Sequence, residues 1–291
     1  MRRAELVSLL GEGFKPARGG LRHIWAVFWA QMKIFLSYKL WVASDILNTM
    51  ISIAMYYFMS FQIPPEEFRE LGYGESYLAF SLVGIATAYY LWACVNRLSH
   101  AMQHEIREGT FETVVSSQIP LWSYVIGQSA RGFTTGLFWL LGSFAAGYAL
   151  GVRYVATPAT LASAALLFVV MVVALFSLGI ASAGVILVYK KGDPLTFFFT
   201  VFAEFFSGIM FPLKMLEKYP LLKAISLAIP YTHGIDALRR ILILGETLAS
   251  PSVWRSTLVL LGFSALFIPL SMLSFKWGYN RVRQLGETAT Y

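Results

Sequence analysis

The sequence has few charged residues, and this scarcity excludes most soluble proteins. Only 13% of its 291 residues are charged, whereas 57% are hydrophobic and the mean hydropathy is +0.62. Soluble domains carry about 25% charged residues, and a chain this apolar would expose too much hydrocarbon to water. A lipid bilayer solvates such a surface, provided that the backbone polar groups are paired within the protein. The composition therefore predicts helices that cross a membrane.

Cysteine and processing signals are also scarce. The one cysteine, Cys94, excludes an intrachain disulfide and a tetrathiolate metal site, and we expect it to be a small packing residue. Residues 1–20 have no apolar core of signal-peptide length, so the first apolar segment is expected to remain in the mature protein. The formal charge of +7 is carried by residues that flank apolar segments, which argues against nucleic acid as a partner and favours membrane lipid.

Six apolar segments are long enough to cross a bilayer, which takes about 20 helical residues. They cover residues 40–61, 77–95, 124–150, 161–188, 195–211 and 253–275. Basic residues dominate before the first segment and acidic residues after it, so the positive-inside rule places the N-terminus in the cytoplasm. We expect an all-α, multi-pass protein of the inner (plasma) membrane with both termini cytoplasmic. Its parts are a cytoplasmic N-terminus at 1–39, a six-helix transmembrane domain at 40–275 and a cytoplasmic tail at 276–291.

An amphipathic pattern precedes the first crossing. Apolar side chains recur at spacings of three and four over residues 21–36, with Arg22 and Lys33 on the opposite side. The pattern predicts a helix that lies in the cytoplasmic interface of the membrane. The alternative is that this segment is the first part of an over-long crossing helix.

The segment 212–252 is placed outside by an even count of crossings, yet it carries five basic residues. A seventh crossing over 221–244 would bring several ionisable side chains into hydrocarbon at a cost in free energy. We instead expect a re-entrant or interfacial helical hairpin at 212–250, broken at Pro230, which dips into the outer leaflet. The residues assigned to this hairpin are Pro230, Tyr231, Thr232, Asp236 and Arg239.

The loop between the second and third crossings is short and dense in charge. We expect a compact helix near 98–113 in which Glu105 and Glu108 share one face. Gly109 is its expected stop, and Thr110 is expected to cap a second short helix. Such a helix is suited to docking in a cleft of another protein, and the alternative is a solvated loop helix.

Three motifs in this frame resemble those of type 2 ABC-transporter permeases, the transmembrane subunits of bacterial and archaeal ABC exporters. Residues 107–112, Arg-Glu-Gly-Thr-Phe-Glu, resemble an Arg-Glu-Gly-Thr-Leu-Glu run of that family. Residues 206–213 resemble its Ser-Gly-x-x-Phe-Pro, and residues 229–239 resemble its Asn-Pro-x-Thr-x-x-x-Asp-x-x-Arg. The resemblance covers essentially the whole chain and departs at Phe111, where leucine is usual, and at Ile229, where asparagine is usual.

The resemblance implies a homodimer, or a dimer with a similar permease, joined to two nucleotide-binding ATPase subunits that hold ATP and Mg²⁺. It also implies that the loop helix is the coupling helix for the ATPase and that the N-terminal helix flanks it as a gate. The chain contains no Gly-x-x-x-x-Gly-Lys-Ser/Thr phosphate loop, so we expect no enzymatic activity and no cofactor on this chain. The coupling residues are Glu105, Arg107, Glu108, Gly109, Thr110, Phe111 and Glu112.

Two ionisable residues lie within the crossings, Arg131 in the third and Glu204 in the fifth. A rise of about 1.5 Å per residue gives them similar depths, and an unpaired charge in a membrane is costly, so an ion pair is predicted. The alternative is that Glu204 faces a translocation path. The residues assigned to a path or gate are Tyr89, Glu204, Phe206, Ser207, Gly208, Phe211 and Pro212. The other aromatic residues that could line it are Tyr56, Tyr57, Tyr90, Trp92 and Phe205.

A metal site is not expected. His100 and His104 are one helical turn apart, but no third ligand beyond Glu105 is evident.

The sequence therefore favours an ATP-driven export permease for a hydrophobic or amphipathic substrate, drug-like or lipid-like. A polysaccharide or glycolipid export permease of the same family is one alternative. An ion-coupled secondary transporter is another, and it would need ion ligands on broken helices, for which only the Pro230 region offers anything similar. An intramembrane enzyme is disfavoured because neither His-Glu-x-x-His nor Gly-x-Ser-x-Gly occurs.

Overall fold

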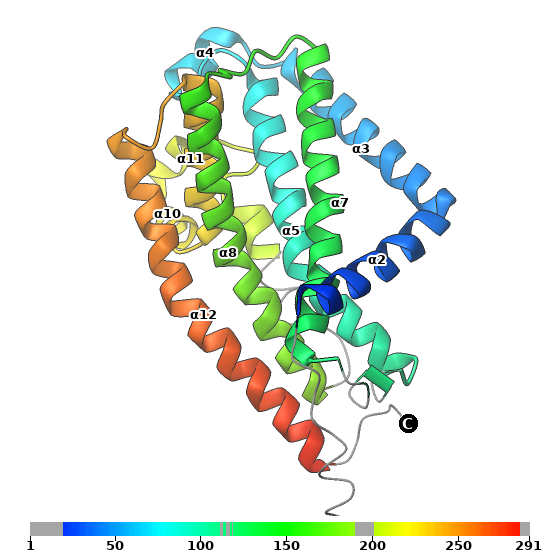
Figure 1. The fold of residues 1–291 in the computed structure, drawn as a ribbon. Coiled ribbons are helices and arrows are strands. Elements are labelled where there is room, and N and C mark those ends of the chain that lie inside the picture. Colours follow the sequence, from blue (N-terminus) through cyan, green and yellow to red (C-terminus); the bar gives the residue numbers. More distant parts are fainter. Residues whose placement is uncertain (1–19, 111–112, 115–116, 118, 190–200, 286–291) are drawn as a thin grey trace, which may run out of the picture.

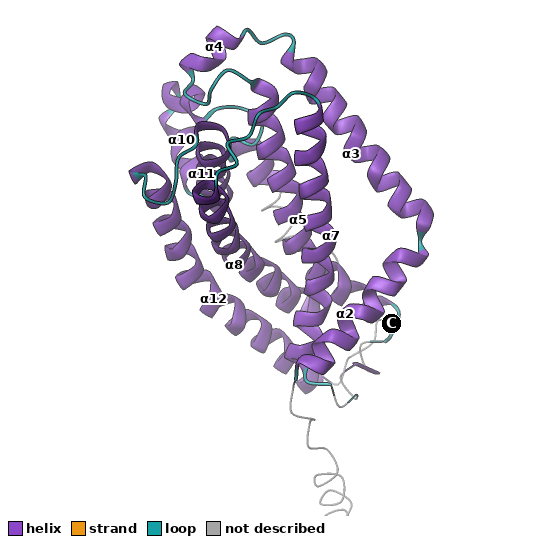
Figure 2. Cartoon of the chain, turned by 45° about the horizontal axis from the view of Figure 1, so that its top comes forward, coloured by secondary structure: helices purple, strands orange, loops and turns teal. Residues whose placement is uncertain are grey.

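The computed structural model describes residues 20–110, 113–114, 117, 119–189 and 201–285, and these ranges contain helices but no strands (Figures 1 and 2). Its long helices are α3 (Lys39–Ser60), α5 (Tyr77–Arg107), α7 (Leu121–Ala149), α8 (Pro158–Tyr189) and α12 (Pro251–Leu285). Four of them, α3, α5, α8 and α12, are long and apolar enough to cross a membrane. α7, which corresponds to the third predicted crossing, is not among these four.

The centre of the bundle is α5, which packs against α7, α8 and α11 (Pro230–Leu244). Nearly all of its first ten residues are buried. α8 and α12 lie side by side along most of their length (Figure 1).

The amphipathic segment forms a helix of its own, α2 (Leu21–Ser37). Tyr38, with φ −89° and ψ 65°, interrupts the helix before α3 begins, so the alternative of one over-long helix is wrong. Figure 2 shows that α2 and α3 meet at a bend and that α2 crosses the lower end of the bundle. α2 packs on α7 at Gly127, where an added Cβ would lie 2.7 Å from Cβ of Val27.

Two helices are longer than predicted. α5 continues without a break to Arg107, so the prediction of a separate loop helix is wrong for residues 98–107. The reason is an apolar stripe, Leu98, Met102 and Ile106, which is buried among the charged residues and packs in a second hydrophobic cluster. α12 likewise extends to Leu285, ten residues past the predicted end of its crossing, and its Phe275 and Val282 join the same cluster.

The fifth predicted crossing is shorter at its end than expected. Residues 195–200 lie outside the described residues, and residues 201–206 are helical. The helix ends before Ser207 instead of continuing to Phe211, because Gly208 has a φ of +70° and leaves the helical conformation.

The segment after this crossing contains η1 (Leu213–Lys218), α10 (Pro220–Leu227) and α11. α10 and α11 are separate helices with the break at Ile229–Pro230, because proline fixes φ and lacks the N–H that a continuous helix would need. Both lie in the upper half of the molecule, the end that carries α4 (Pro65–Glu70) (Figure 1). Lys214 donates from Nζ to the carbonyl oxygen of Glu70 at 2.6 Å, which ties η1 to α4.

Candidate functional site

The Arg107–Thr110 segment forms the exposed turn that ends α5. Arg107 and Glu108 are exposed, and Gly109 has a φ of +71°, a left-handed conformation that favours glycine. Gly109 thus occupies the position of a helix stop. Phe111 and Glu112, the last two residues assigned to coupling, lie outside the described residues.

Glu105 is half-buried and braces α5 against α7. Its carboxylate accepts hydrogen bonds from the hydroxyl of Tyr124, at 3.0 Å, and from the hydroxyl of Thr110. Gln128 donates in turn to the Tyr124 oxygen at 3.3 Å. The Thr110 hydroxyl donates back to Glu105 on α5. Residues 111 and 112, which follow it, lie outside the described residues, so the cap on a second helix stays a prediction. Glu105 and Glu108 were expected to share one face of a helix. In the structure Glu105 is half-buried, and Glu108 is the exposed carboxylate of the two.

Arg239 connects the motif at residues 229–239 with the motif at residues 206–213. Its side chain is 2% exposed, and its guanidinium donates to the carbonyl of Gly208 at 2.6 Å, to that of Ile209, and to that of Phe80 at 3.1 Å. The guanidinium also lies over the Phe80 ring. A Cβ on Gly84 would lie 2.1 Å from Nη2 of Arg239, so only a glycine leaves room for this side chain on α5. One arginine thus provides donors for the carbonyls of Gly208 and Ile209, just after the helix at residues 201–206 ends.

Asp236 holds the hairpin to the loop before α5. It accepts hydrogen bonds from the Tyr73 hydroxyl and from Nε of Arg240, the latter at 3.0 Å. Burial, and next the charge of Asp236, raise the pKa of Tyr73 above its ordinary value, so the phenol stays protonated and donates at physiological pH. Thr232 donates to the carbonyl of Ser226 at 2.6 Å and so links α11 to α10. The buried Pro230 begins α11.

A cavity of about 620 Å³, the aromatic cavity, lies between α3, α5, residues 201–210 and the start of α11. α5 lines it with Tyr89, Trp92, Asn96, His100 and Gln103. The opposite side is lined by Tyr56, Glu204, Met210 and Tyr231, among others. The cavity thus combines aromatic rings with two amides and a carboxylate.

The structure brings two of the predicted path residues, Tyr89 and Glu204, together in this cavity. The others are absent from its lining. Phe206 stacks on Phe202 with ring centroids 5.7 Å apart, and the buried Ser207 donates to the carbonyl of Ala203. The remaining three positions, Gly208, Phe211 and Pro212, lie in the turn before η1.

The predicted ion pair between Arg131 and Glu204 is not formed in the described chain, where no nitrogen and oxygen of the two lie within 4.0 Å. The guanidinium of Arg131 lies over the ring of Phe35 from α2, 4.9 Å from its centroid, and lines a second cavity. Glu204 lines the aromatic cavity instead. Similar depth along two helices does not decide which way their side chains point, and the cost of an unpaired charge does not decide which partner it finds.

Within the described ranges, no group of three His, Cys, Asp or Glu side chains gathers where a metal ion could bind. His100 and His104 are both exposed at the lower end of α5, and His100 also lines the aromatic cavity.

Four polar or aromatic residues of the cavity were not assigned to the path from the sequence: Asn96, His100, Gln103 and Tyr231. The first three continue a stripe with Tyr89 and Trp92 at spacings of three and four, which is one face of a helix. This periodicity was the signal that could have identified them. It was obscured because the helix was expected to end at residue 95.

The segments described above lie within a region that matches a known protein family. The ABC-2 type transporter family matches residues 22–243, which is most of the chain and includes α2, α5 and all three motifs. None of the curated proteins compared with the chain matches it significantly. The family comprises the transmembrane part of transporters, distinct from the ATPase subunit. From this match, the apolar helices and the motifs assembled around α5, we conclude that the chain belongs to the ABC-2 type transporter family, as a multi-pass membrane permease.

Proposed function

We propose that this permease exports a hydrophobic or amphipathic compound, drug-like or lipid-like, with energy from ATP hydrolysed on a separate nucleotide-binding subunit. That subunit supplies the phosphate loop and holds ATP and Mg²⁺. The observation that carries the proposal is the continuity of α5, whose exposed end and cavity face belong to one helix.

α5 is suited to transmit movement. It has 31 residues, which corresponds to about 46 Å of helix. Its lower end presents Arg107 and Glu108 to a partner, and the face above that end lines the aromatic cavity. The bond between Glu105 and Tyr124 ties the same end to α7. A displacement of the Glu108 turn by the ATPase is thereby carried to the cavity wall without an intervening hinge.

The lining of the aromatic cavity supports the substrate class. Tyr89 and Trp92 expose ring surface, and amides and Glu204 add polar contacts. Cavities with mostly apolar walls and a few fixed polar groups bind amphipathic small molecules. A polysaccharide or glycolipid substrate is the alternative within the family, and an ion-coupled secondary transporter is the alternative outside it.

We further propose a dimer, of two copies or with a similar permease, with α3 near its interface. α3 is covered by little of its own chain: Met50 and Phe58 are exposed, the latter by 64%. The aromatic cavity lies beside α3, so a second permease packed there would close the cavity and place two such cavities near one axis.

In this proposal both termini and the Glu108 turn are cytoplasmic, in the inner membrane. The lower end of the described chain carries Arg22, Arg107 and Lys276, and the upper end carries Glu66 and Glu70 (Figure 1). The hairpin of α10 and α11 then dips into the membrane from the outer side, and α2 lies in the cytoplasmic interface as a gate beside the coupling turn.

Reversing the charge of the exposed turn tests the coupling role. We expect Glu108→Arg to weaken the ATPase complex roughly tenfold or more, because a like charge replaces a complementary one at the contact. Retention of the ATPase on the tagged permease and ATP-dependent accumulation of an amphiphilic dye in inverted vesicles would both fall. Glu66→Arg, the same change on the exposed outer helix α4, is the matched control. Equal transport by both variants would refute the coupling role.

Copurification separates the function classes. The tagged chain, extracted gently from native membranes, should retain an ATP-hydrolysing subunit in fixed ratio. If the purified chain alone in vesicles accumulates the dye when an ion gradient is imposed, the secondary-transporter alternative is correct.

A further inference from the structure

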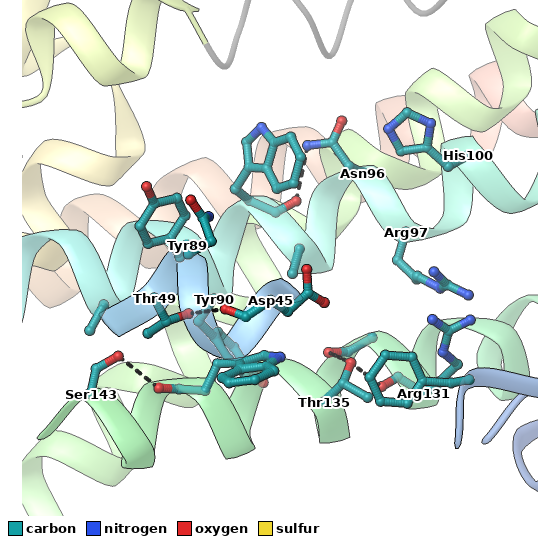
Figure 3. A pocket seen from close by; sticks show the side chains of 18 residues that line it. Asp45, Thr49, Tyr89, Tyr90, Asn96, Arg97, His100, Arg131, Thr135 and Ser143 are labelled. Atoms are coloured by element: carbon teal, nitrogen blue, oxygen red, sulfur yellow. Dashed lines mark hydrogen bonds between the residues drawn. The ribbon is translucent and has the colours of Figure 1, made fainter. Parts of the chain in front are cut away.

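A second cavity, of about 460 Å³, lies between the end of α2, α3, α5 and α7, and we name it the arginine cavity. Its polar end is formed by Arg97 of α5, Arg131 of α7 and Asp45 of α3, and its other end by rings such as those of Tyr90 and Trp139. Figure 3 shows Arg97 and Arg131 extending toward one another across the cavity.

The two arginines are held close by the backbone beneath them. Arg97 lies against Gly132 of α7, where an added Cβ would be 2.8 Å from Cγ of Arg97. Arg131 precedes that glycine directly and is flanked by the ring of Phe35. The helix packing of α5 on α7 therefore places both arginines at the same end of one cavity.

Within the described chain, neither guanidinium has an anionic partner. No carboxylate oxygen lies within 4.0 Å of either, although Asp45 lines the same cavity. Nε of Arg97 and Nε of Arg131 are both buried without a hydrogen-bond acceptor. Buried donors of charged groups are normally satisfied, and two adjacent cations repel, so the arrangement favours an added anion.

The position of the pair indicates which anion. Arg131 contacts α2 through Phe35, and with α2 in the cytoplasmic interface the two guanidinia lie at the level of lipid headgroups. The cavity continues from there toward Tyr90 and Trp139, which offer apolar surface for a hydrocarbon chain. The planar donors of arginine match the oxygens of a phosphate group.

We propose that the arginine cavity binds a phosphate-bearing amphiphile, with the phosphate between Arg97 and Arg131 and the hydrocarbon along α5 and α7. The cavity shares Tyr89, Trp92, Asn96 and His100 with the aromatic cavity, so the ligand lies beside the proposed path. A role of this ligand as cargo rests on the proposed export function. The binding itself does not, because it requires neither ATP nor a partner.

Binding of defined ligands to the purified full-length permease in detergent, without ATP, tests the site. The probes are dioctanoyl phosphatidylglycerol, dioctanoyl phosphatidylcholine and inorganic phosphate, with affinity measured by calorimetry. We expect the anionic lipid to bind, the zwitterionic lipid to bind more weakly, and inorganic phosphate to bind weakest because it lacks the chain. Equal affinity for inorganic phosphate and the anionic lipid would overturn the amphiphile assignment.

The variants should change the affinity for phosphatidylglycerol in opposite directions, which a merely structural role of these residues would not produce. Arg97→Gln and Arg131→Gln should each weaken phosphatidylglycerol binding roughly tenfold, through loss of one charge-assisted contact. Asp45→Asn should strengthen it several-fold, because a carboxylate that repels the phosphate is removed. Arg153→Gln, the same change on an exposed arginine at the upper end, is the control and should have no effect.

Folding is checked in the same samples. Thermal unfolding without lipid should be unchanged or shifted upward in Arg97→Gln and Arg131→Gln, since each removes one of two unpaired cations. Phosphatidylglycerol binding that persists in the double variant Arg97→Gln/Arg131→Gln would refute the site. That result would leave the coupling role of Glu108 untouched, and loss of coupling at Glu108 would leave this binding intact.

Discussion

At the scale of single residues, Arg239 connects segments that are far apart along the chain. Its three acceptors lie in α5 and in the turn after the fifth crossing, 30 to 159 residues away along the chain. Each of the three guanidinium nitrogens of Arg239 donates to a carbonyl oxygen, which lowers the free-energy cost of burying both the cation and the carbonyls. The sequence identified Arg239 as part of a motif, but its acceptors are backbone atoms, which leave no mark on side-chain patterns.

The close packing of Arg239 against α5 can be tested at Gly84. We expect Gly84→Ala to lower the free energy of unfolding by roughly 2–3 kcal/mol, because the new Cβ would overlap the guanidinium and lie 2.6 Å from the carbonyl oxygen of Ile209. Unfolding in mixed micelles measures the change. Gly142→Ala is the control, since nothing lies within 4 Å of its Cβ position and alanine favours the helix by up to about 1 kcal/mol. Similar stability of the two variants would contradict the fit described.

Among the helices, four of the six predicted crossings correspond to helices long and apolar enough to span a membrane, and several helix ends were predicted poorly. α3 and α8 begin and end close to the predicted segments. An uninterrupted apolar run long enough to cross a bilayer is readily recognised from the sequence. The ends of α5 and α12 were missed because their last turns are charged on one side, while Met102 and Phe275 on the other side are buried. Average hydropathy cannot separate the two faces of such a helix, whereas a three-to-four periodicity does.

The candidate site was foreseen in part. The Arg107–Thr110 turn and the hairpin motif were recognisable because local residue types define them. The relation between α5, the fifth crossing and the hairpin depends on how helices rotate about their axes, which one sequence does not specify. Tyr89 and Glu204 line one cavity, whose role as a path stays a prediction, whereas Arg131 contacts Phe35 and not Glu204.

The contact between α2 and α7 can be tested at Gly127. We expect Gly127→Leu to displace α2, because an added Cβ already lies 2.8 Å from the carbonyl oxygen of Ile24. Amide hydrogen exchange over Leu21–Ser37 should become roughly tenfold faster, which corresponds to about 1.4 kcal/mol of lost docking. Gly262→Leu in α12, where nothing lies within 4 Å, should leave exchange in α2 unchanged. Unaltered exchange in both variants would show that α2 does not depend on this contact.

For the whole molecule, the proposed orientation gives a labelling pattern. The one native cysteine, Cys94, is buried, so introduced cysteines report on a low background. In intact cells a membrane-impermeant maleimide should label Arg153→Cys and Glu217→Cys at the proposed outer end. It should label Glu108→Cys and Lys276→Cys only after the membrane is permeabilised. The reverse pattern would show that the protein has the opposite orientation in the membrane. The Glu108 turn could then not contact a cytoplasmic ATPase.

The arrangement of Arg239 also has a consequence for biogenesis. Its acceptors at Phe80, Gly208 and Ile209 are synthesised before the arginine itself, so their carbonyl oxygens lack this partner while α5, α7 and α8 are already being inserted. Multi-helix chains fold from the N-terminus as they are synthesised. Here α5 can accept the hydrogen bond from Arg239 only after residue 239 has been made. A nascent chain halted before that point would leave the carbonyl oxygens of Gly208 and Ile209 without the Arg239 donor, a difference by which quality control could distinguish an incomplete permease from a finished one.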